Sequence, residues 1–314
     1  MNQYQPEGFL LSSTKNYEYT KSLEGLRSAM EKQIILEAVA TMCDHELNLT
    51  VDFCQKIKGV IPKNEVVFSQ SESAKDIAIL TRVGKTVCFK VIGFTEDSSG
   101  VPMAILSRRA AQKECFENYL SSLVPGDIIP ARVTHIENFG AFVDIGCGVI
   151  SLLSIDTISI SRISHPSARV KVGDFIYTVV KGRDDLGRIY VSERELLGTW
   201  EENAALFTIG ETVIGTVRSI ESYGIFVELK PNLAGLAEYR DDVQVGQRAA
   251  VYIKSIIPDK MKIKLIIIDT HDNECDHESL EYFVDVDTTL HMDEWKYSPP
   301  TSKRVIESVF VEKH

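Results

Sequence analysis

The chain of 314 residues lacks the features that mark several large classes of protein. It has no apolar run approaching the ~20 residues that a membrane-spanning helix needs. Its N-terminal stretch, MNQYQPEGFLLSSTK, has no basic region leading into an apolar core and so does not resemble a signal peptide. We therefore expect a cytoplasmic protein that makes no contact with a membrane. The six cysteines form no CxxC pair, which predicts free thiols and not a disulfide framework.

Motifs for catalysis are also missing. The sequence contains no phosphate-binding Walker A loop, no GxSxG nucleophile turn and no HExxH zinc motif. No pair of carboxylates stands out for acid–base chemistry. The cluster HDNECDH at 271–277 contains zinc-type donors, but its spacing fits no standard closed metal site. We predict that the protein is not an enzyme and that it holds no cofactor and no metal.

Basic charge is scarce, because the net charge is −11. Such a balance argues against a generic nucleic-acid binder, which usually carries an excess of Lys and Arg. The acidity is uneven, however. Residues 271–314 hold four Lys or Arg against eleven Asp or Glu, whereas residues 125–198 hold eight against nine. The middle of the chain therefore still has the composition for a local positive face.

The most informative feature present is an internal repeat. The segment PGDIIPARVTHIENFGAFVDI, from Pro125, matches IGETVIGTVRSIESYGIFVEL, from Ile209. Both pass from glycine and an acid through a β-rich run to aromatic-Gly-x-Phe and then Val-acid. Each copy continues with an apolar run, a Val-Gly step and a last run that carries a basic residue. A weaker third copy begins upstream at Ile35.

Each copy is predicted to form five short strands, because runs rich in Val, Ile, Thr and aromatic residues alternate with Gly, Asp, Asn and Pro. Five strands in about 70 residues suit a small closed barrel, for which the five-stranded OB-fold is the usual solution. We therefore expect a mainly β protein of tandem OB-fold barrels joined by short α-helices. The spacing of Ser192 and Glu195 is typical of a capping box at the start of the second linker helix.

The expected order of parts starts with a helical extension and ends with an acidic appendage laid on the third barrel. The boundaries are 1–34 for the extension, 35–110 for a degenerate barrel, 111–124 for a linker helix, 125–195 for the second barrel, 196–208 for another linker helix, 209–270 for a shortened third barrel and 271–314 for the appendage.

These residues resemble the S1 domain of bacterial ribosomal protein S1, an OB-fold that binds single-stranded RNA. The strings NFGAFVDI, RISHPSARVKVGD and GRIYVSERE match the S1-type pattern closely over residues 125–195. Residues 209–270 match it well in their first half and are truncated later, while residues 35–110 match only in degenerate form. The linker VSERELLGTWEENAALF is also similar to the short proteins of this family in Gram-positive anaerobes.

The resemblance implies that two aromatic pairs form platforms on which RNA bases stack, Phe139 with Phe142 and Tyr223 with Phe226. Stacking contributes about 1–3 kcal/mol per base and tolerates any base sequence. Residues three apart on a flat strand point to opposite faces. Gly140 removes that obstacle by allowing a turn or bulge, so both rings can reach one surface. The aligned positions of the first copy hold no aromatic residue.

Charged residues near the platforms are expected to contact phosphate. The resemblance implies an acid–arginine pair that Asp184 and Arg188 match best, with a one-residue slip to Arg183 left open. The other expected RNA-binding residues lie in a loop of the second copy and in the last strand of the third: Arg162, His165 and Arg169, and Lys262 and Lys264. A histidine typical of the family is replaced by Ser154 in the second copy and by Glu238 in the third.

We therefore predict a non-enzymatic, single-stranded RNA-binding protein that acts in translation or RNA metabolism, with the small ribosomal subunit as a candidate partner. The second barrel is expected to provide most of the affinity. Two alternatives remain open at this point. OB barrels also serve as protein-interaction scaffolds, which the acidity of the chain favours. The same domain is also appended to polynucleotide phosphorylase and other ribonucleases, so an accessory factor of a ribonuclease complex is the second alternative.

Overall fold

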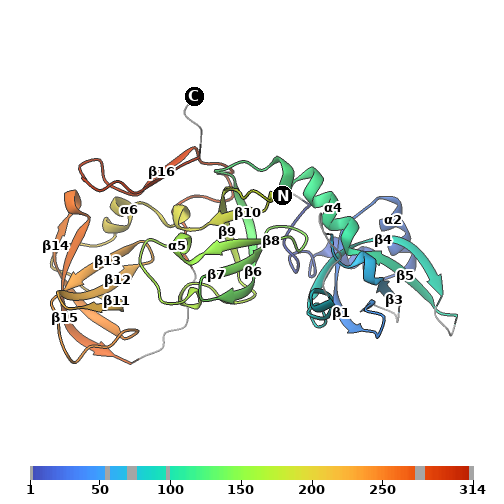
Figure 1. The fold of residues 1–314 in the computed structure, drawn as a ribbon, viewed down its shortest axis with the longest axis horizontal. Coiled ribbons are helices and arrows are strands. Elements are labelled where there is room, and N and C mark those ends of the chain that lie inside the picture. Colours follow the sequence, from blue (N-terminus) through green and yellow to red (C-terminus); the bar gives the residue numbers. More distant parts are fainter. Residues whose placement is uncertain (1–2, 54–56, 69–75, 97–99, 273–279, 311–314) are drawn as a thin grey trace. The chain divides into compact units, whose positions relative to one another are not determined.

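The structure is a computed structural model that describes residues 3–53, 57–68, 76–96, 100–272 and 280–310. It contains three closed five-stranded β-barrels, which confirms the expected mainly β fold (Figure 1). The chain divides into two compact units, residues 1–123, 130–132 and 144–150 forming the first and the remainder the second. Within the described parts, none of the helices combines the length and the apolar character that a membrane span needs.

The first barrel follows two short helices, each started by a serine whose side chain accepts a backbone N–H. Its strands connect in the order β1-β2-β3-β5-β4, with β3 and β5 parallel and the other neighbours antiparallel. The elements of this region are α1 (Thr14–Thr20), α2 (Leu23–Glu31), β1 (Leu36–Cys43), β2 (Leu49–Asp52), β3 (Lys58–Ile61), η2 (Lys63–Glu65), α3 (Asp76–Leu80), β4 (Thr86–Glu96), β5 (Pro102–Ser107), α4 (Arg108–Asn118) and η3 (Leu120–Ser122).

The second barrel has the order β10-β8-β7-β6-β9 and is followed by a linker. Its elements are β6 (Ile128–Glu137), β7 (Gly140–Asp144), β8 (Ile150–Ser154), α5 (Ile155–Ile158), η4 (Pro166–Ala168), β9 (Phe175–Arg183), β10 (Ile189–Ser192), η5 (Arg194–Leu197) and α6 (Trp200–Ala204). The capping box lies at Thr199 and Glu202, not at Ser192 and Glu195 as the sequence suggested. The hydroxyl of Ser192 instead bonds the carboxylate of Glu195, and the helix begins at Trp200 with Thr199 as its N-cap, seven residues after Ser192.

The third barrel repeats the connection β11-β12-β13-β15-β14. Its elements are β11 (Thr212–Glu221), β12 (Gly224–Lys230), β13 (Leu233–Ala237), β14 (Arg248–Ile257), η6 (Pro258–Lys260) and β15 (Lys262–His271). Buried and exposed side chains alternate along the first half of β15. Ile263, Leu265 and Ile267 are buried in the barrel core, and the residues between them are exposed.

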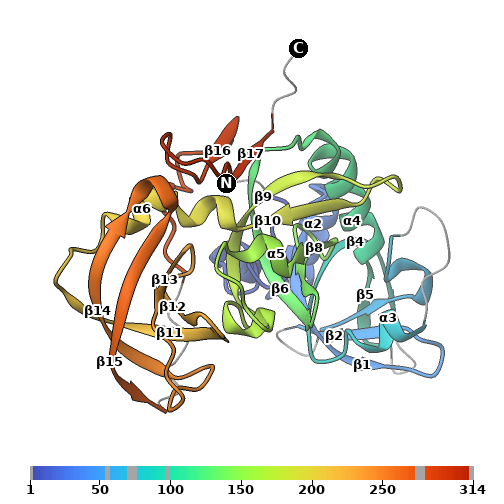
Figure 2. The same ribbon diagram turned by 60° about the vertical axis from the view of Figure 1, so that its left-hand side comes forward.

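The C-terminal segment carries a small sheet, β16 (Glu294–Lys296) paired with β17 (Glu307–Val309) (Figure 2). The expectation that this appendage lies on the third barrel is incomplete. Trp295 and Tyr297 do pack into the core of the third barrel. Other apolar residues of the segment, including Tyr282 and Phe310, pack against the second barrel. The sequence analysis missed this second contact because apolar residues in an irregular segment carry no periodic signal.

A buried ion pair anchors the N-terminal segment within the first unit. Glu7 accepts hydrogen bonds from Nε and Nη2 of Arg108 at 2.6 and 3.0 Å. The backbone N–H of Glu7 donates to Asp144 at 2.7 Å, and Arg108 also donates to the carbonyl of Gly148 at 3.3 Å. Because both charges are buried, each would be costly to leave without its partner. The four described cysteines are free thiols, as expected.

Glu37 of β1 makes stability depend on pH. Its side chain is buried, Oε2 accepts the Leu10 N–H at 3.0 Å and Oε1 has no partner. Burial raises the pKa of this carboxyl from 4.5 to about 8. Between these values the folded state keeps a proton that the unfolded chain has lost. The contribution of Glu37 to stability is therefore largest below about pH 4.5 and falls as the pH rises towards 8.

The substitution Glu37→Gln should remove this dependence, because an amide does not ionise. We expect the stability of the variant relative to the parent to increase steadily between about pH 5 and pH 8. Urea unfolding followed by circular dichroism at several pH values measures this difference. A difference that stays constant over the window would show that Glu37 is already ionised in the folded protein.

Candidate nucleic-acid interface

An aromatic platform stands on the hairpin between β6 and β7. Phe139 lies in the turn and is 54% exposed, while Phe142 lies on β7 and is half-buried. Their ring centroids are 6.0 Å apart and the rings are nearly perpendicular, at 89°. Edge-to-face packing of this kind holds both rings in place. The sequence analysis expected the two rings to share one surface, and the structure brings them together there.

Gly140 explains how Phe139 and Phe142 reach the same surface. A Cβ on Gly140 would lie 2.4 Å from the carbonyl oxygen of Leu153 in β8, so only glycine fits. The close approach of β8 therefore requires a glycine directly after the turn. Phe139 itself lies in the turn and so leaves the alternating pattern of the strands.

A third ring joins the platform, and sequence reasoning missed it. His135 of β6 stacks beside Phe142 with centroids 6.2 Å apart and planes inclined by 21°. Its Nε2 lies 2.8 Å from a carboxylate oxygen of Glu137. His135 aligns with Ser219 of the third repeat, and Ser219 is the direct cross-strand neighbour of Phe226. The repeat alignment combined with strand pairing could therefore have found it.

The outer surface continues from the platform onto β8 and β10. Tyr190 of β10 pairs in parallel register with Leu152 of β8, and its ring is 43% exposed. Leu152 aligns with Leu236, which pairs with Phe226 in the third barrel. The second barrel thus presents a row of half-exposed apolar side chains beside the two phenylalanines. Tyr190 is a further surface ring that the sequence analysis did not single out.

Asp184 and Arg188 form the expected acid–arginine pair, which removes the alternative of a slip to Arg183. Arg188 Nε donates to Asp184 Oδ2 at 2.7 Å. The other oxygen of Asp184 accepts the backbone N–H groups of Leu186 and Arg188 at 3.0 and 2.9 Å. These bonds, the Arg188 N–H foremost, lower the pKa of Asp184. The pair shapes the β9–β10 turn and holds a largely exposed guanidinium at the start of β10.

The loop between α5 and β9 does not form the basic patch that the sequence suggested. Arg169 is buried and ion-paired with Glu228 of the third barrel, so it cannot contact RNA. His165 accepts the Ser167 N–H at its Nδ1, which caps the short helix η4. Of the three basic residues that the sequence suggested here, only Arg162 is exposed. The Ser161 N–H donates to the Pro231 carbonyl at 3.1 Å, so this loop packs on the third barrel.

The third barrel carries a second aromatic platform, which is more exposed than the first. Tyr223 lies in the β11–β12 turn and is 68% exposed, and its centroid is 6.2 Å from that of Phe226. Lys262 takes the place of Arg188 at the start of β15, and Lys264 pairs with Leu236 in the place of Tyr190. The exposed Glu238 follows β13 directly. A negative charge therefore lies at the end of the strand next to this platform.

The first barrel has no aromatic residue at the equivalent places. Thr50 pairs with Met42, in the positions that Phe142 and His135 occupy in the second barrel. Leu47 lies in the preceding turn with a positive φ of 66°. The first barrel therefore repeats the hairpin but lacks the stacking surface.

The comparisons with known proteins agree with this geometry. A family model described as S1 RNA binding domain matches residues 123–193, the second barrel with its platform. Residues 123–193 are an S1 RNA-binding domain. The resemblance that the sequence showed is thus confirmed for the barrel in which its motifs are most complete.

The similarity extends over most of the chain. The small ribosomal subunit protein bS1 of Staphylococcus epidermidis is 29% identical over 279 residues, which cover 83% of this chain and 68% of that protein. A bS1 homolog of Bacillus subtilis is 28% identical over 271 residues, covering 84% of this chain and 67% of the homolog. The repeats outside the S1 domain therefore also have counterparts in these relatives.

Solved structures add little to this picture. A multidomain protein with nucleic acid binding domains from Streptococcus pneumoniae has a TM-score of 0.24 at 15% identity, covering 75% of this chain and 73% of its own. GSP13 from Bacillus subtilis has a TM-score of 0.22 at 24% identity, covering 23% of this chain and 57% of its own. Both scores are too low to support an argument about this chain.

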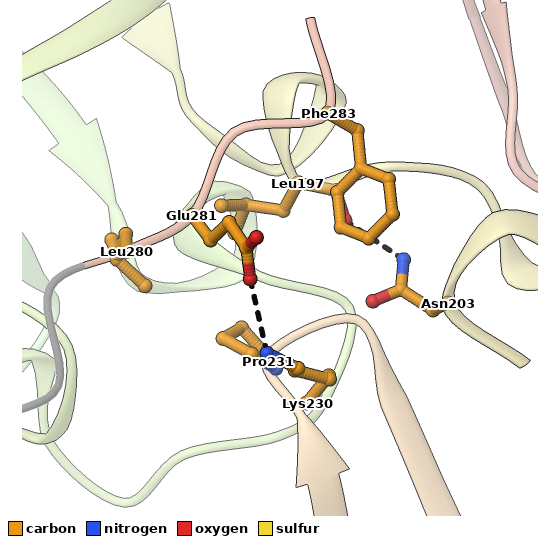
Figure 3. A pocket seen from close by; sticks show the side chains of 7 residues that line it. All are labelled: Leu197, Asn203, Lys230, Pro231, Leu280, Glu281 and Phe283. Atoms are coloured by element: carbon orange, nitrogen blue, oxygen red, sulfur yellow. Dashed lines mark hydrogen bonds and ion pairs between the residues drawn. The ribbon is translucent and has the colours of Figure 1, made fainter. Parts of the chain in front are cut away.

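A cavity of about 390 Å³ lies away from Phe139 and Phe142. It is lined by the linker after β10, the β12–β13 turn and the C-terminal segment (Figure 3). Its polar side chains are already paired. Lys230 bonds Glu281 at 3.1 Å, and Asn203 donates to the Leu197 carbonyl at 2.8 Å. No cluster of metal-ligating side chains occurs in the described ranges. Most of the 271–277 cluster considered above lies in residues 273–279, outside them.

The fold of the hairpin that carries Phe139 and Phe142 should depend on Gly140, which directly follows the turn. In Gly140→Ala the new methyl group would clash with the Leu153 carbonyl, so we expect a loss of about 1–3 kcal/mol of stability in this barrel. Thermal unfolding of the full chain measures it. Gly93→Ala is a matched control, because its nearest neighbour would be a side-chain carbon at an ordinary 3.7 Å. Equal effects of the two substitutions would contradict the proposed role of Gly140.

Proposed function

We propose that the chain binds single-stranded RNA mainly through the second barrel, with bases stacked on Phe139 and Phe142. The observation that supports this most is the ring pair on the β6–β7 hairpin of an S1 RNA-binding domain, whose centroids are 6.0 Å apart. Each ring offers a face or edge to a base, and stacking on such rings tolerates any sequence. His135 and Tyr190 widen the surface for further bases.

Arg188 is proposed as the main phosphate contact of this barrel. Asp184 holds its guanidinium in one orientation, while the side chain stays 72% exposed and open to a ligand. Arginine offers several N–H donors, so one interaction with Asp184 leaves others for a phosphate oxygen. Arg162 and His165 are proposed as peripheral contacts, whereas the buried Arg169 cannot reach RNA.

The third barrel is proposed as a weaker site that uses Tyr223, Phe226, Lys262 and Lys264. It keeps two rings and two exposed lysines but has no arginine held by an acid at the start of its last strand. Glu238 would repel phosphate near this platform. We propose residues 35–110, 125–195 and 209–270 as the three domains, with only the last two taking part in RNA binding.

We propose further that this binding serves translation and that the chain is not an enzyme. The relatives in Staphylococcus and Bacillus are named as proteins of the small ribosomal subunit. An RNA-binding chain similar to them over most of its length fits a place on or near that subunit, in the cytoplasm. Stacking platforms with few charged groups are suited to binding bases.

Replacing both rings tests the proposed platform. We expect Phe139→Ala with Phe142→Ala to weaken binding of a poly-pyrimidine RNA by about 2–6 kcal/mol, taken as two stacked bases. Fluorescence anisotropy with labelled RNA measures this, and circular dichroism must show an unchanged fold. Tyr17→Ala is a matched control, because Tyr17 is equally exposed but lies on α1. Parent-like affinity in the folded double variant would refute the platform.

The equivalent double variant of the third barrel, Tyr223→Ala with Phe226→Ala, ranks the two sites. We expect it to cost less affinity than the second-barrel variant, because Glu238 weakens binding at the third platform and Lys262 lacks the support that Asp184 gives Arg188. Both variants are compared as full chains at one salt concentration, because the C-terminal segment packs on both barrels. A larger loss from the third-barrel variant would reverse the proposed order.

Salt dependence tests how much phosphate contact contributes. Two to four exposed basic residues near the platforms predict a slope of log K against log salt of roughly −1.4 to −2.8 for a single strand. Anisotropy titrations at several salt concentrations give this slope. A much steeper slope would reveal a basic surface that lies outside the proposed site, and a slope near zero would exclude Arg188 as a phosphate contact.

A further inference from the structure

The outer face formed by the first and fourth strands of each barrel is covered in the first barrel. There the cross-strand pair Glu37 and Cys88 is buried. Glu37 accepts the Leu10 N–H, and Asn16 of α1 bonds the backbone of Glu37 in both directions. Lys90, the next outward residue of β4, pairs with Glu114 of α4. The N-terminal segment and α4 thus lie over this face.

The equivalent face of the second barrel is covered by the C-terminal segment. Ile128 and Val179 are outward residues of β6 and β9, and both are buried. Apolar residues of the C-terminal segment pack on them, namely Tyr282, Val284, Val286, Met292 and Phe310. The hydroxyl of Tyr282 also accepts the Tyr177 N–H of β9 at 2.9 Å. A segment from outside the barrel therefore again covers the face.

The third barrel exposes the same face among the described residues. We call it the outer isoleucine face, and its members lie on β11, β14 and β15: Ile214, Ala250, Tyr252, Ile266 and Ile268. Strand register makes them neighbours, because Ile214 pairs with Ala250 and Tyr252 pairs with Ile266. β14 and β15 run side by side along this face (Figure 2).

The exposure of this face is unusual for a barrel surface. Ile214, Ile268 and Ile266 are 61%, 56% and 41% exposed. Single exposed apolar residues are common and need no explanation. Three isoleucines joined by a tyrosine and an alanine form a continuous patch, which is typical of an interaction site. The corresponding patches of the other two barrels are both buried beneath further chain.

The charges at the two ends of the face indicate that a second copy of this chain could bind it. Lys254 and Lys264 lie at one end, beyond Tyr252 and Ile266. Asp269 and Asp272 lie at the other end, beyond Ile268. Arg248 lies there too, opposite His271, so this end has two acidic side chains against one arginine. When two such faces pack with their strands antiparallel, the basic end of each meets the acidic end of the other. A two-fold axis produces this arrangement, as in most homodimers.

We propose that the outer isoleucine face joins two copies of this chain in a reversible, two-fold symmetric dimer. The isoleucines of the two copies interdigitate at the centre of the contact, and Lys254 of each copy faces Asp269 of the other. The contact lies on β11, β14 and the second half of β15, whereas the proposed RNA platform lies on the β11–β12 hairpin. The dimer contact therefore does not cover Tyr223 and Phe226, whereas Lys264 of the proposed RNA site borders it.

Sedimentation velocity of the full chain over a wide concentration series tests the proposal. We expect a concentration-dependent shift from monomer to dimer. Ile268→Lys should raise the dissociation constant at least about tenfold, because a charge would be buried at the centre of the contact. Ile92→Lys is the matched control, since Ile92 is 48% exposed on β4 of the first barrel. This control should leave the dissociation constant unchanged.

A charge exchange tests the antiparallel arrangement. Lys254→Glu and Asp269→Lys should each weaken the dimer, and the two substitutions combined should restore most of the lost affinity. Circular dichroism of Ile268→Lys checks that the variant is folded, and its RNA affinity by anisotropy should equal that of the parent. A chain that is monomeric at every concentration would overturn the proposal and leave the face to another protein. Failure of the combined variant to recover would overturn it as well.

Discussion

One close contact between neighbouring strands controls the arrangement of the site. In the second barrel the backbone of β8 approaches β7 so closely that a Cβ at Gly140 would lie 2.4 Å from a carbonyl oxygen. Gly224 meets the same limit in the third barrel, 2.5 Å from the Ala237 oxygen. The aromatic residue before each glycine is therefore in the turn, and the phenylalanine two places after it is on the strand. Barrel closure and platform geometry thus depend on the same contact.

The last residue of the Val-acid motif has a structural purpose that differs between barrels. In the second barrel Asp144 accepts the N–H groups of Gly146 and Gly148, which shapes the β7–β8 turn, as well as that of Glu7. In the third barrel the aligned Glu228 binds Arg218 and Arg169. The repeated sequence therefore gives repeated strands, while the acid of the Val-acid motif bonds a different preceding segment in each of these two barrels.

Much of the architecture could be predicted from the sequence because the repeats share a hydrophobic alternation and a common aromatic-Gly-x-Phe string. Those patterns are local, and the three barrels follow from them. The ring pairs and the Asp184–Arg188 pair were expected from the resemblance to the S1 domain, because their positions match its motifs. Arg169 was misjudged because its partner, Glu228, lies 59 residues away along the chain. The second contact of the C-terminal segment was missed because its apolar residues lie in an irregular segment without a periodic signal. His135 needed cross-strand register, which a single strand pattern does not contain.

The central claim is that RNA bases lie on the rings of the β6–β7 hairpin. Photo-crosslinking of a 4-thiouridine RNA to the full chain, followed by mass spectrometry of the linked peptides, tests it most directly. The account predicts crosslinks at His135, Phe139 or Phe142, with weaker crosslinking at Tyr223 and Phe226. Crosslinks confined to the first barrel or to the loop at 159–169 would contradict it.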